Sequence, residues 1–147
     1  MRSMNNKEVL KGEDIKMFDI VYVKENEGQG SEQTGDRPYI IVQNDKGNKH
    51  SPTVLGMALT TVLKKEYMPT HCVIRRNSSN NLRKTSMVLG ETLTQIDKKR
   101  IIRKIGKIND FRTRNEIINC YIANITGMNN NKLIKHMSTF FGTANMV

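Results

Sequence analysis

Residues 30–45 constrain the fold of this chain more than any other stretch, because a polar, glycine-flanked loop runs straight into an apolar strand. The glycines allow backbone conformations that other residues avoid. Pro38 disfavours the helical region at Arg37 and therefore predicts an extended backbone there. The pattern fixes a guanidinium at a loop-strand junction, where the nearby carboxylates of Glu32 and Asp36 can hydrogen-bond it and hold its orientation.

Length and cysteine usage narrow the class of protein. A chain of 147 residues is long enough for one domain with a substantial core. No apolar run approaches the ~18 residues of a membrane span, and the first ten residues lack the apolar region of a signal peptide, which predicts a cytoplasmic location. Cys72 and Cys120 lack Cys-x-x-Cys spacing, so we expect two buried, reduced thiols. His50 and His136 stand apart without an acidic cluster, and we expect neither a metal nor another cofactor.

The basic residues are concentrated. The formal net charge is +10, and residues 72–107 hold ten Lys and Arg against Glu91 and Asp97, a local charge of +8. A polyanion such as nucleic acid is the simplest partner for a surface of this kind. Solubility alone is the alternative use of the charge.

Short β-branched and apolar segments separated by turn residues predict a strand-rich body. The expected strands are residues 18–23, 37–43, 54–60, 70–75 and 86–92, with polar connections at 44–52 and 77–84. In the strand 54–60 the bulky side chains Leu55, Met57 and Leu59 share one face. The opposite face carries small residues, and we expect it to let a substrate backbone approach Thr60.

Two helices are expected after the strands. Asp97 is a good N-cap for a short helix whose stripe is Ile101, Ile105 and Ile108 and which ends at Gly106. Asn109 is expected to cap a longer helix that ends near Gly127. The apolar face predicted for this second helix consists of Phe111, Ile118, Tyr121, Ile122 and Ile125.

The two ends of the chain differ from this body. Residues 1–16 are polar and unpatterned, which predicts a loosely held extension before a domain at 17–127. In the extension 128–147 apolar residues return with helical spacing, and we expect a short helix that packs on its own domain. Contact with a second protomer is the alternative. The apolar residues of this helix are Leu133, Ile134, Met137, Phe140 and Phe141.

Residues 30–38 read Gly-Ser-Glu-Gln-Thr-Gly-Asp-Arg-Pro, which resembles the Gly-Ser-Glu-Gln-x-Gly-x-Arg-Pro signature of the MazF/PemK/Kid toxin family. These toxins are metal-independent endoribonucleases of bacterial toxin–antitoxin systems. The likeness covers roughly residues 18–125 and looks closest to the MazF-type enzymes of Gram-positive bacteria. The family usually has glycine where Phe18 stands. Further matches follow in order at residues 43–48, 51–53, 58–60, 69–71 and 96–100.

The resemblance implies both a fold and an activity. The implied fold is mainly β with helices, a small SH3-like barrel with a C-terminal helix that assembles as a homodimer. The implied activity is sequence-specific cleavage of single-stranded RNA, including mRNA, to 2′,3′-cyclic phosphate and 5′-hydroxyl ends, which inhibits translation and growth. A small acidic MazE-like antitoxin is the implied protein partner.

The resemblance also places Arg37, Thr60 and Glu32 at catalytic positions. Attack of a ribose 2′-hydroxyl on phosphorus builds negative charge on the non-bridging oxygens, which a fixed guanidinium at Arg37 stabilises. Thr60 orients a phosphate oxygen or the nucleophile, and Glu32 aligns Arg37 or accepts a proton. The residues expected to contact RNA are Ser31, Gln33, Asn44, Thr53, Thr61, Glu91 and Thr92.

Some details of the family do not transfer. Thr92 and Thr94 replace a Gln and an Arg that lie near bound RNA in close relatives, so the recognised bases are not predicted. His71 matches a family position and is interpreted as structural. Two rival functions remain: a module that poisons DNA gyrase, as the CcdB branch of this barrel does, and a regulator that binds RNA without cutting it.

Overall fold

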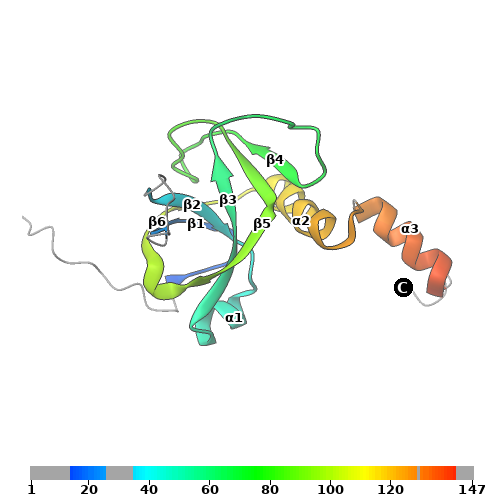
Figure 1. Ribbon diagram of the computed structural model, residues 1–147, viewed down its shortest axis with the longest axis horizontal. Helices are drawn as coiled ribbons and strands as arrows, with labels where there is room; N and C mark the ends of the chain where they lie inside the picture. The colour runs from blue at the N-terminus through cyan, green and yellow to red at the C-terminus, as the bar shows by residue number, and fades with distance from the viewer. Residues whose placement is uncertain (1–13, 26–34, 129, 142–147) are drawn as a thin grey trace, which may run out of the picture.

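The computed structural model describes residues 14–25, 35–128 and 130–141 and shows one curled antiparallel sheet flanked by helices (Figure 1). The strand order is β4-β5-β3-β2-β1-β6, and each neighbouring pair is antiparallel. This arrangement confirms the expected mainly β fold. The strands are β1 (Asp19–Val23), β2 (Arg37–Ile41), β3 (Thr53–Thr60), β4 (His71–Ile74), β5 (Ser86–Asp97) and β6 (Ile101–Lys107).

Apolar side chains cover both faces of the central strands, because successive residues of a strand point to opposite faces. Ile20 and Ile40 lie on the face that packs against Ile117 of helix α2 (Phe111–Thr126). Val21 and Val54 belong to a second cluster on the opposite face. Burying a side chain of this size contributes about 1.5–3 kcal/mol, so the two clusters together hold the curvature that positions the strand ends.

The expectation that the small residues of β3 let a substrate backbone approach is wrong. A Cβ on Gly56 would lie 2.9 Å from Cδ1 of Ile96 and 3.3 Å from the carbonyl oxygen of Ile40. Ala58 is buried in the second cluster. The space left by the small residues is therefore filled by the chain's own curl. The bulky face was predicted correctly, since Met57 and Leu59 are buried in the first cluster.

The connection between β2 and β3 contains a short helix, α1 (Asp45–His50), where only turns were expected. Asn44 is its N-cap, and Oδ1 of Asn44 accepts a hydrogen bond of 2.8 Å from the backbone N–H of Gly47. An asparagine cap satisfies one of the donors left free at a helix start. This local hydrogen bond was not read from the sequence.

The prediction of a helix at residues 97–106 is wrong. Asp97 does act as a cap, but for a single 3₁₀ turn, η2 (Lys98–Arg100), which leads into β6. Bulges interrupt the pairing of β1 with β6, so Ile101 joins the second cluster while Ile105 packs against the first. The four-residue spacing that resembled a helical stripe is thus produced by an irregular strand.

Helix α2 presents a different face from the one predicted. Its N-cap is Asp110, not Asn109, and the helix ends as expected at Gly127, whose φ of 69° lies in the left-handed region. Ile118 and Tyr121 do pack against the core. The buried residues are Ile117, Cys120 and Ala123, whereas Phe111 and Ile125 are exposed. Gly90 lets the helix backbone approach β5, because a Cβ there would lie 3.1 Å from the carbonyl oxygen of Cys120.

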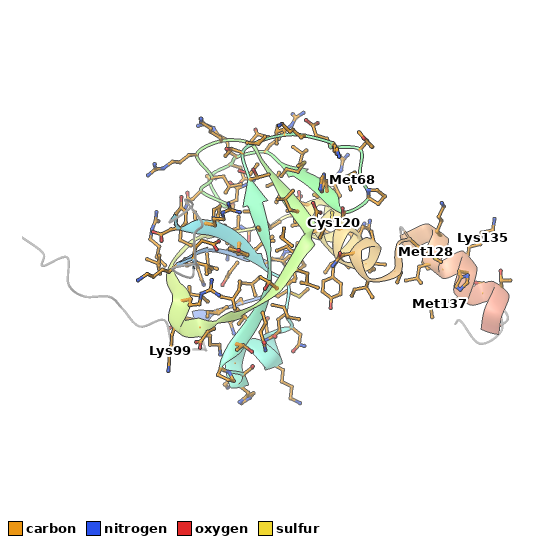
Figure 2. The ribbon with its side chains drawn as sticks, in the orientation of Figure 1. Met68, Lys99, Cys120, Met128, Lys135 and Met137 are labelled. Atoms are coloured by element: carbon orange, nitrogen blue, oxygen red, sulfur yellow. The ribbon has the colours of Figure 1, made fainter. Side chains whose placement is uncertain are left out.

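The C-terminal helix is confirmed as α3 (Asn130–Phe141), but it does not pack on its own sheet. Figure 1 shows α3 directed away from the body, and Figure 2 shows Met137 on this outlying helix, far from Cys120 at the sheet. Ile134 and Met137 are exposed. The expected packing of this segment on its own domain is thus limited to contact with α2, and Ile134 and Met137 are left for another surface.

Phe18 stands where the resemblance to the toxin family predicts a glycine. Its φ is 71°, a left-handed conformation that costs a residue with a Cβ about 1–2 kcal/mol. The ring is buried in the first cluster and lies 4.9 Å from the guanidinium of Arg114, a cation–π contact. Burial of a phenylalanine contributes a comparable or larger amount, so the aromatic ring offsets the backbone strain.

The end of the expected N-terminal extension belongs to the body. Ile15 is buried in the second cluster, and the backbone N–H of Met17 donates a 2.7 Å hydrogen bond to Oδ1 of Asp45. Residues 1–13 lie outside the described residues. The prediction that residues 1–16 form a loosely held extension is therefore wrong for the last of them, which pack on the body.

Candidate functional site

Arg37 and Thr60 stand at the ends of neighbouring strands. The β2–β3 register pairs Tyr39 with Ala58 and Ile40 with Met57, and continued by two residues it sets Arg37 opposite Thr60. Residues directly opposite on one face of a sheet have Cβ atoms about 4.5–5.5 Å apart. Both side chains therefore project from one corner of the sheet, as the sequence predicts for a catalytic pair.

Glu25, which the sequence analysis missed, is a carboxylate partner of Arg37. Nε of Arg37 lies 3.8 Å from Oε1 of Glu25, and the Tyr39 hydroxyl donates a 3.2 Å hydrogen bond to the same oxygen. Burial and the neighbouring Glu25 raise the pKa of Tyr39, so its hydroxyl stays protonated and keeps donating. Glu25 follows β1 by two residues, on the face shared with Val23, which pairs with Arg37. The strand register is the signal that would have found it.

The Thr60 hydroxyl is partly engaged. Its Oγ1 accepts a 3.1 Å hydrogen bond from the backbone N–H of Val62, which fixes the turn after β3. A hydroxyl that accepts one hydrogen bond still has its own proton to donate. Thr60 is thus oriented by the backbone and can donate to a phosphate oxygen placed beside Arg37.

His71 and Glu91 form an ion pair on the other side of β3. Nε2 of His71 lies 2.8 Å from Oε1 of Glu91, and Nδ1 lies 2.8 Å from the carbonyl oxygen of Lys65. Burial alone lowers the pKa of His71, but the hydrogen bonds to Glu91 and Lys65 outweigh it and raise that pKa. The charged ring donates at both nitrogens. His71 therefore ties the connection after β3 to β5, which agrees with its interpretation as structural.

This geometry predicts a pH-dependent contribution to stability. The pKa of His71 is raised on folding. The free energy of unfolding of the wild type should therefore exceed that of His71→Gln by the largest amount below about pH 6.5, the pKa of an unfolded histidine. The gain should disappear as the pH rises through the higher folded pKa. The pKa of Glu91 is lowered, so the gain should also shrink in acid as that carboxylate becomes protonated. Thermal unfolding of both proteins across pH measures the difference.

His50→Gln is the matched control, since it makes the same substitution at an exposed histidine at the end of α1, away from Glu91. Glu91→Gln should remove most of the pH dependence. A difference between wild type and His71→Gln that stays constant across pH would rule out the charged ring as the stabilising species.

Three of the residues predicted to bind RNA are engaged in the fold. Asn44 caps α1. Thr53, at the start of β3, accepts a 2.9 Å hydrogen bond from Nε2 of Gln95. It stands at the other end of the strand from Thr60, roughly 23 Å away for an extended strand of this length. Thr92 accepts from the N–H of Ala58 and donates to the carbonyl of Leu89, which closes the bulge between β3 and β5. These bonds constrain what the three side chains can offer a ligand.

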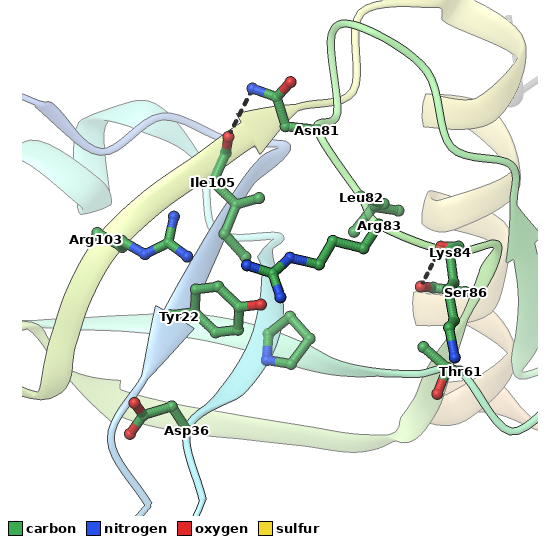
Figure 3. Close-up of a pocket in the computed structure, with 11 residues that line it drawn as sticks. Tyr22, Asp36, Thr61, Asn81, Leu82, Arg83, Lys84, Ser86, Arg103 and Ile105 are labelled. Atoms are coloured by element: carbon green, nitrogen blue, oxygen red, sulfur yellow. Dashed lines mark hydrogen bonds between the residues drawn. The ribbon is translucent and has the colours of Figure 1, made fainter.

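Other predicted residues fall elsewhere. Thr61 lines a groove together with Asp36 and Pro38, on the sheet face opposite to Thr60 (Figure 3). Glu91 is close to half exposed beside His71. Ser31, Glu32 and Gln33 lie outside the described residues.

The cysteines match their expectation, since Cys72 and Cys120 are free and buried. The hydrogen bond with Cys120, followed by burial, raises the pKa of the Cys72 thiol, which stays protonated. Over residues 14–25, 35–128 and 130–141 there is no group of three or more His, Cys, Asp or Glu side chains placed to hold a metal ion. In the same part of the chain no helix is long and apolar enough to cross a membrane.

Residues 16–131 match the family described as PemK-like, MazF-like toxin of type II toxin–antitoxin system, and the chain belongs to that family. It is 45% identical over 82 residues to Endoribonuclease MazF of Staphylococcus saprophyticus, an overlap of 56% of this chain and 68% of that protein. The resemblance read from residues 30–38 is therefore confirmed.

Solved structures of low identity share the fold. MazF from Deinococcus radiodurans superimposes with a TM-score of 0.60 at 16% identity, over 78% of this chain and 97% of that one. A mycobacterial endoribonuclease, solved in complex with its cognate antitoxin, gives a TM-score of 0.61 at 20% identity, over 76% and 94% of the two chains. The curled six-stranded sheet is thus the fold of MazF toxins.

Proposed function

We propose that this toxin is an endoribonuclease that cuts single-stranded RNA at specific sequences without a metal ion. The observation that carries the proposal is the β2–β3 register, which sets Arg37 opposite Thr60 when it is continued by two residues, with Glu25 beside the guanidinium. The 45% identity to a protein named Endoribonuclease MazF supports the same activity. In this reaction the ribose 2′-hydroxyl attacks the adjacent phosphorus and the 5′-oxygen leaves, which yields 2′,3′-cyclic phosphate and 5′-hydroxyl ends.

Each side chain has a distinct task in this mechanism. Arg37 donates two N–H groups to the non-bridging oxygens, where charge develops in the transition state. Thr60, held by the N–H of Val62, donates its hydroxyl proton to the same phosphate or orients the nucleophile. Glu25 aligns the guanidinium, which frees Glu32 for the role of proton acceptor. Arg37 itself remains charged throughout, because its reference pKa lies far above neutral pH.

A digestion of defined RNA with end mapping tests the proposal. We expect cleavage in excess EDTA, 2′,3′-cyclic phosphate ends, and no cutting where the 2′-hydroxyl is replaced by hydrogen. RNA that is bound but left intact would identify a regulator instead. Inhibition of gyrase supercoiling by a chain that leaves RNA uncut would favour the gyrase-poisoning alternative.

We further propose a homodimer and a small acidic antitoxin as partners. Ile134 and Met137 on α3 form an exposed apolar pair that an adjoining protomer would cover. The net charge of +10 favours rapid association with an acidic chain that competes with RNA. Light scattering on the full chain and on a chain ending at Met128 tests the first proposal, and growth arrest relieved by an adjacent acidic gene product tests the second.

A further inference from the structure

A groove of about 630 Å³ opens beside the proposed catalytic corner, and we name it the Tyr22 groove. Asp36 and Pro38, which flank Arg37 in sequence, line it, and so does Thr61, which follows Thr60. Successive strand residues point to opposite faces, so the groove lies on the sheet face opposite to Arg37 and Thr60. An RNA chain held at Arg37 would reach the groove by passing around the ends of β2 and β3. Its volume suits a single nucleotide, within the roughly 300–1,000 Å³ of ligand sites.

Basic and apolar side chains lie next to one another around the groove. Arg83 and Lys84 reach it from the β4–β5 connection, and Arg103 reaches it from β6 (Figure 3). The guanidinium carbon of Arg103 lies 4.6 Å from the centre of the Tyr22 ring, a stacked arrangement. Three cations therefore face one carboxylate, Asp36, among the side chains that line the groove. This combination of guanidinium groups and an apolar wall is what a phosphate with an attached base requires.

The connection that carries Arg83 is held rigidly. Asn80 is fully buried, and its amide donates to the carbonyl of Arg75 while Oδ1 accepts from the N–H groups of Asn77 and Leu82. Preorganised donors bind a ligand with little loss of conformational entropy. The groove is thus formed before any ligand arrives.

The same connection is tied to the sheet. Nδ2 of Asn81 donates a 3.0 Å hydrogen bond to the carbonyl oxygen of Ile105, and the N–H of Lys107 donates to the carbonyl of Ser79. Ile105 is also part of the groove wall. Movement of this connection would break bonds to β6, so the backbone that carries Arg83 keeps its place beside β6.

We propose that the Tyr22 groove binds a nucleotide of the RNA strand that flanks the cleaved bond. Arg83 and Arg103 hold its phosphate, and Tyr22 with Ile105 receives its base. The inference rests on the proposed endoribonuclease function, and it assigns the strand a path from the Arg37–Thr60 corner across the edge of the sheet. A free nucleotide would offer the groove the same phosphate and base, and the experiment below distinguishes the two ligands.

The test measures binding, so it does not depend on cleavage. A labelled 2′-O-methyl RNA dodecamer of random sequence, which lacks the nucleophile, is titrated by fluorescence anisotropy over a range of salt. Each phosphate contact to a single strand contributes about 0.7 to the slope of log K against log salt. Arg83→Ala should weaken binding and reduce the slope by about that amount, whereas Arg83→Lys should retain it.

Arg112→Ala is the matched control, because it removes the same charge from a side chain that is 90% exposed on α2. It should leave the slope unchanged, and thermal unfolding should show that Arg83→Ala is folded. Equal slopes for wild type and Arg83→Ala would overturn the proposal. It would also be overturned if Arg83→Ala weakened the binding of adenosine monophosphate but not the binding of the dodecamer. A chain that cuts no RNA yet shows the Arg83-dependent slope would refute the proposed activity and leave the groove assignment standing.

Discussion

Arg37→Ala is expected to slow RNA cleavage by roughly 10²–10³-fold and to leave the fold intact. The loss is large because the guanidinium stabilises charge that exists only in the transition state. The effect on stability is small, since the side chain of Arg37 is 46% exposed and its 3.8 Å ion pair with Glu25 is partly screened by water. Single-turnover cleavage rates, measured beside the affinity for uncleavable RNA, separate loss of chemistry from loss of binding.

The companion variants distinguish charge from geometry. Arg37→Lys should recover only part of the rate, because an ammonium cannot reproduce the planar two-pronged contact. Glu25→Gln keeps an acceptor for the Tyr39 hydroxyl but weakens the hold on Arg37, so it should lower the rate less than Arg37→Ala does. Thr60→Ser should retain more activity than Thr60→Ala, since it keeps the hydroxyl. Full activity of Arg37→Ala would show that the proposed mechanism is wrong.

The nearness of Arg37 and Thr60 in the sheet could be predicted from the sequence because its determinants are local, and their catalytic role stays a prediction. Pro38 sets the backbone at Arg37, and alternation in residues 54–60 places Thr60 on one face of its strand. Antiparallel pairing then brings the two together. The partner Glu25 was missed for the opposite reason, because its position depends on the register of β1 against β2, which no local pattern states.

Long-range pairing also explains the wrong helix. Ile101 and Ile105 have helical spacing, but β1 has an unpaired edge that β6 satisfies with backbone hydrogen bonds. Two bulges then turn these isoleucines to opposite faces of the sheet. Local propensity and spacing over a few residues do not outweigh the hydrogen bonds that pair β6 with the edge of β1. The face of α2 was mispredicted for a similar reason, since it depends on where the helix backbone approaches Gly90 of β5.

Gly106→Ala is expected to destabilise the protein more than any other glycine-to-alanine change tested with it. A Cβ at Gly106 would lie 2.5 Å from the carbonyl oxygen of Asn80 and 2.6 Å from that of Ser79, both backbone atoms that cannot swing aside. Overpacking typically costs about 1–3 kcal/mol, and two rigid backbone contacts place this change at the upper end, about 3 kcal/mol. In a chain of this length that corresponds to a fall of roughly 6–12 °C in Tm, measured by thermal unfolding.

Two other glycines separate the clash from the general effect of adding a methyl group. Gly127 has a φ of 69° and open space around its Cα, so Gly127→Ala should cost only the left-handed strain of about 1–2 kcal/mol. Gly35 has neither constraint, and Gly35→Ala should stay within about 0.5 kcal/mol of the wild type. Equal losses at Gly106 and Gly127 would mean that the β4–β5 connection yields easily. Such compliance would also remove the rigid support of Arg83, so the stability series and the binding test at the Tyr22 groove examine the same contact between Asn80 and β6.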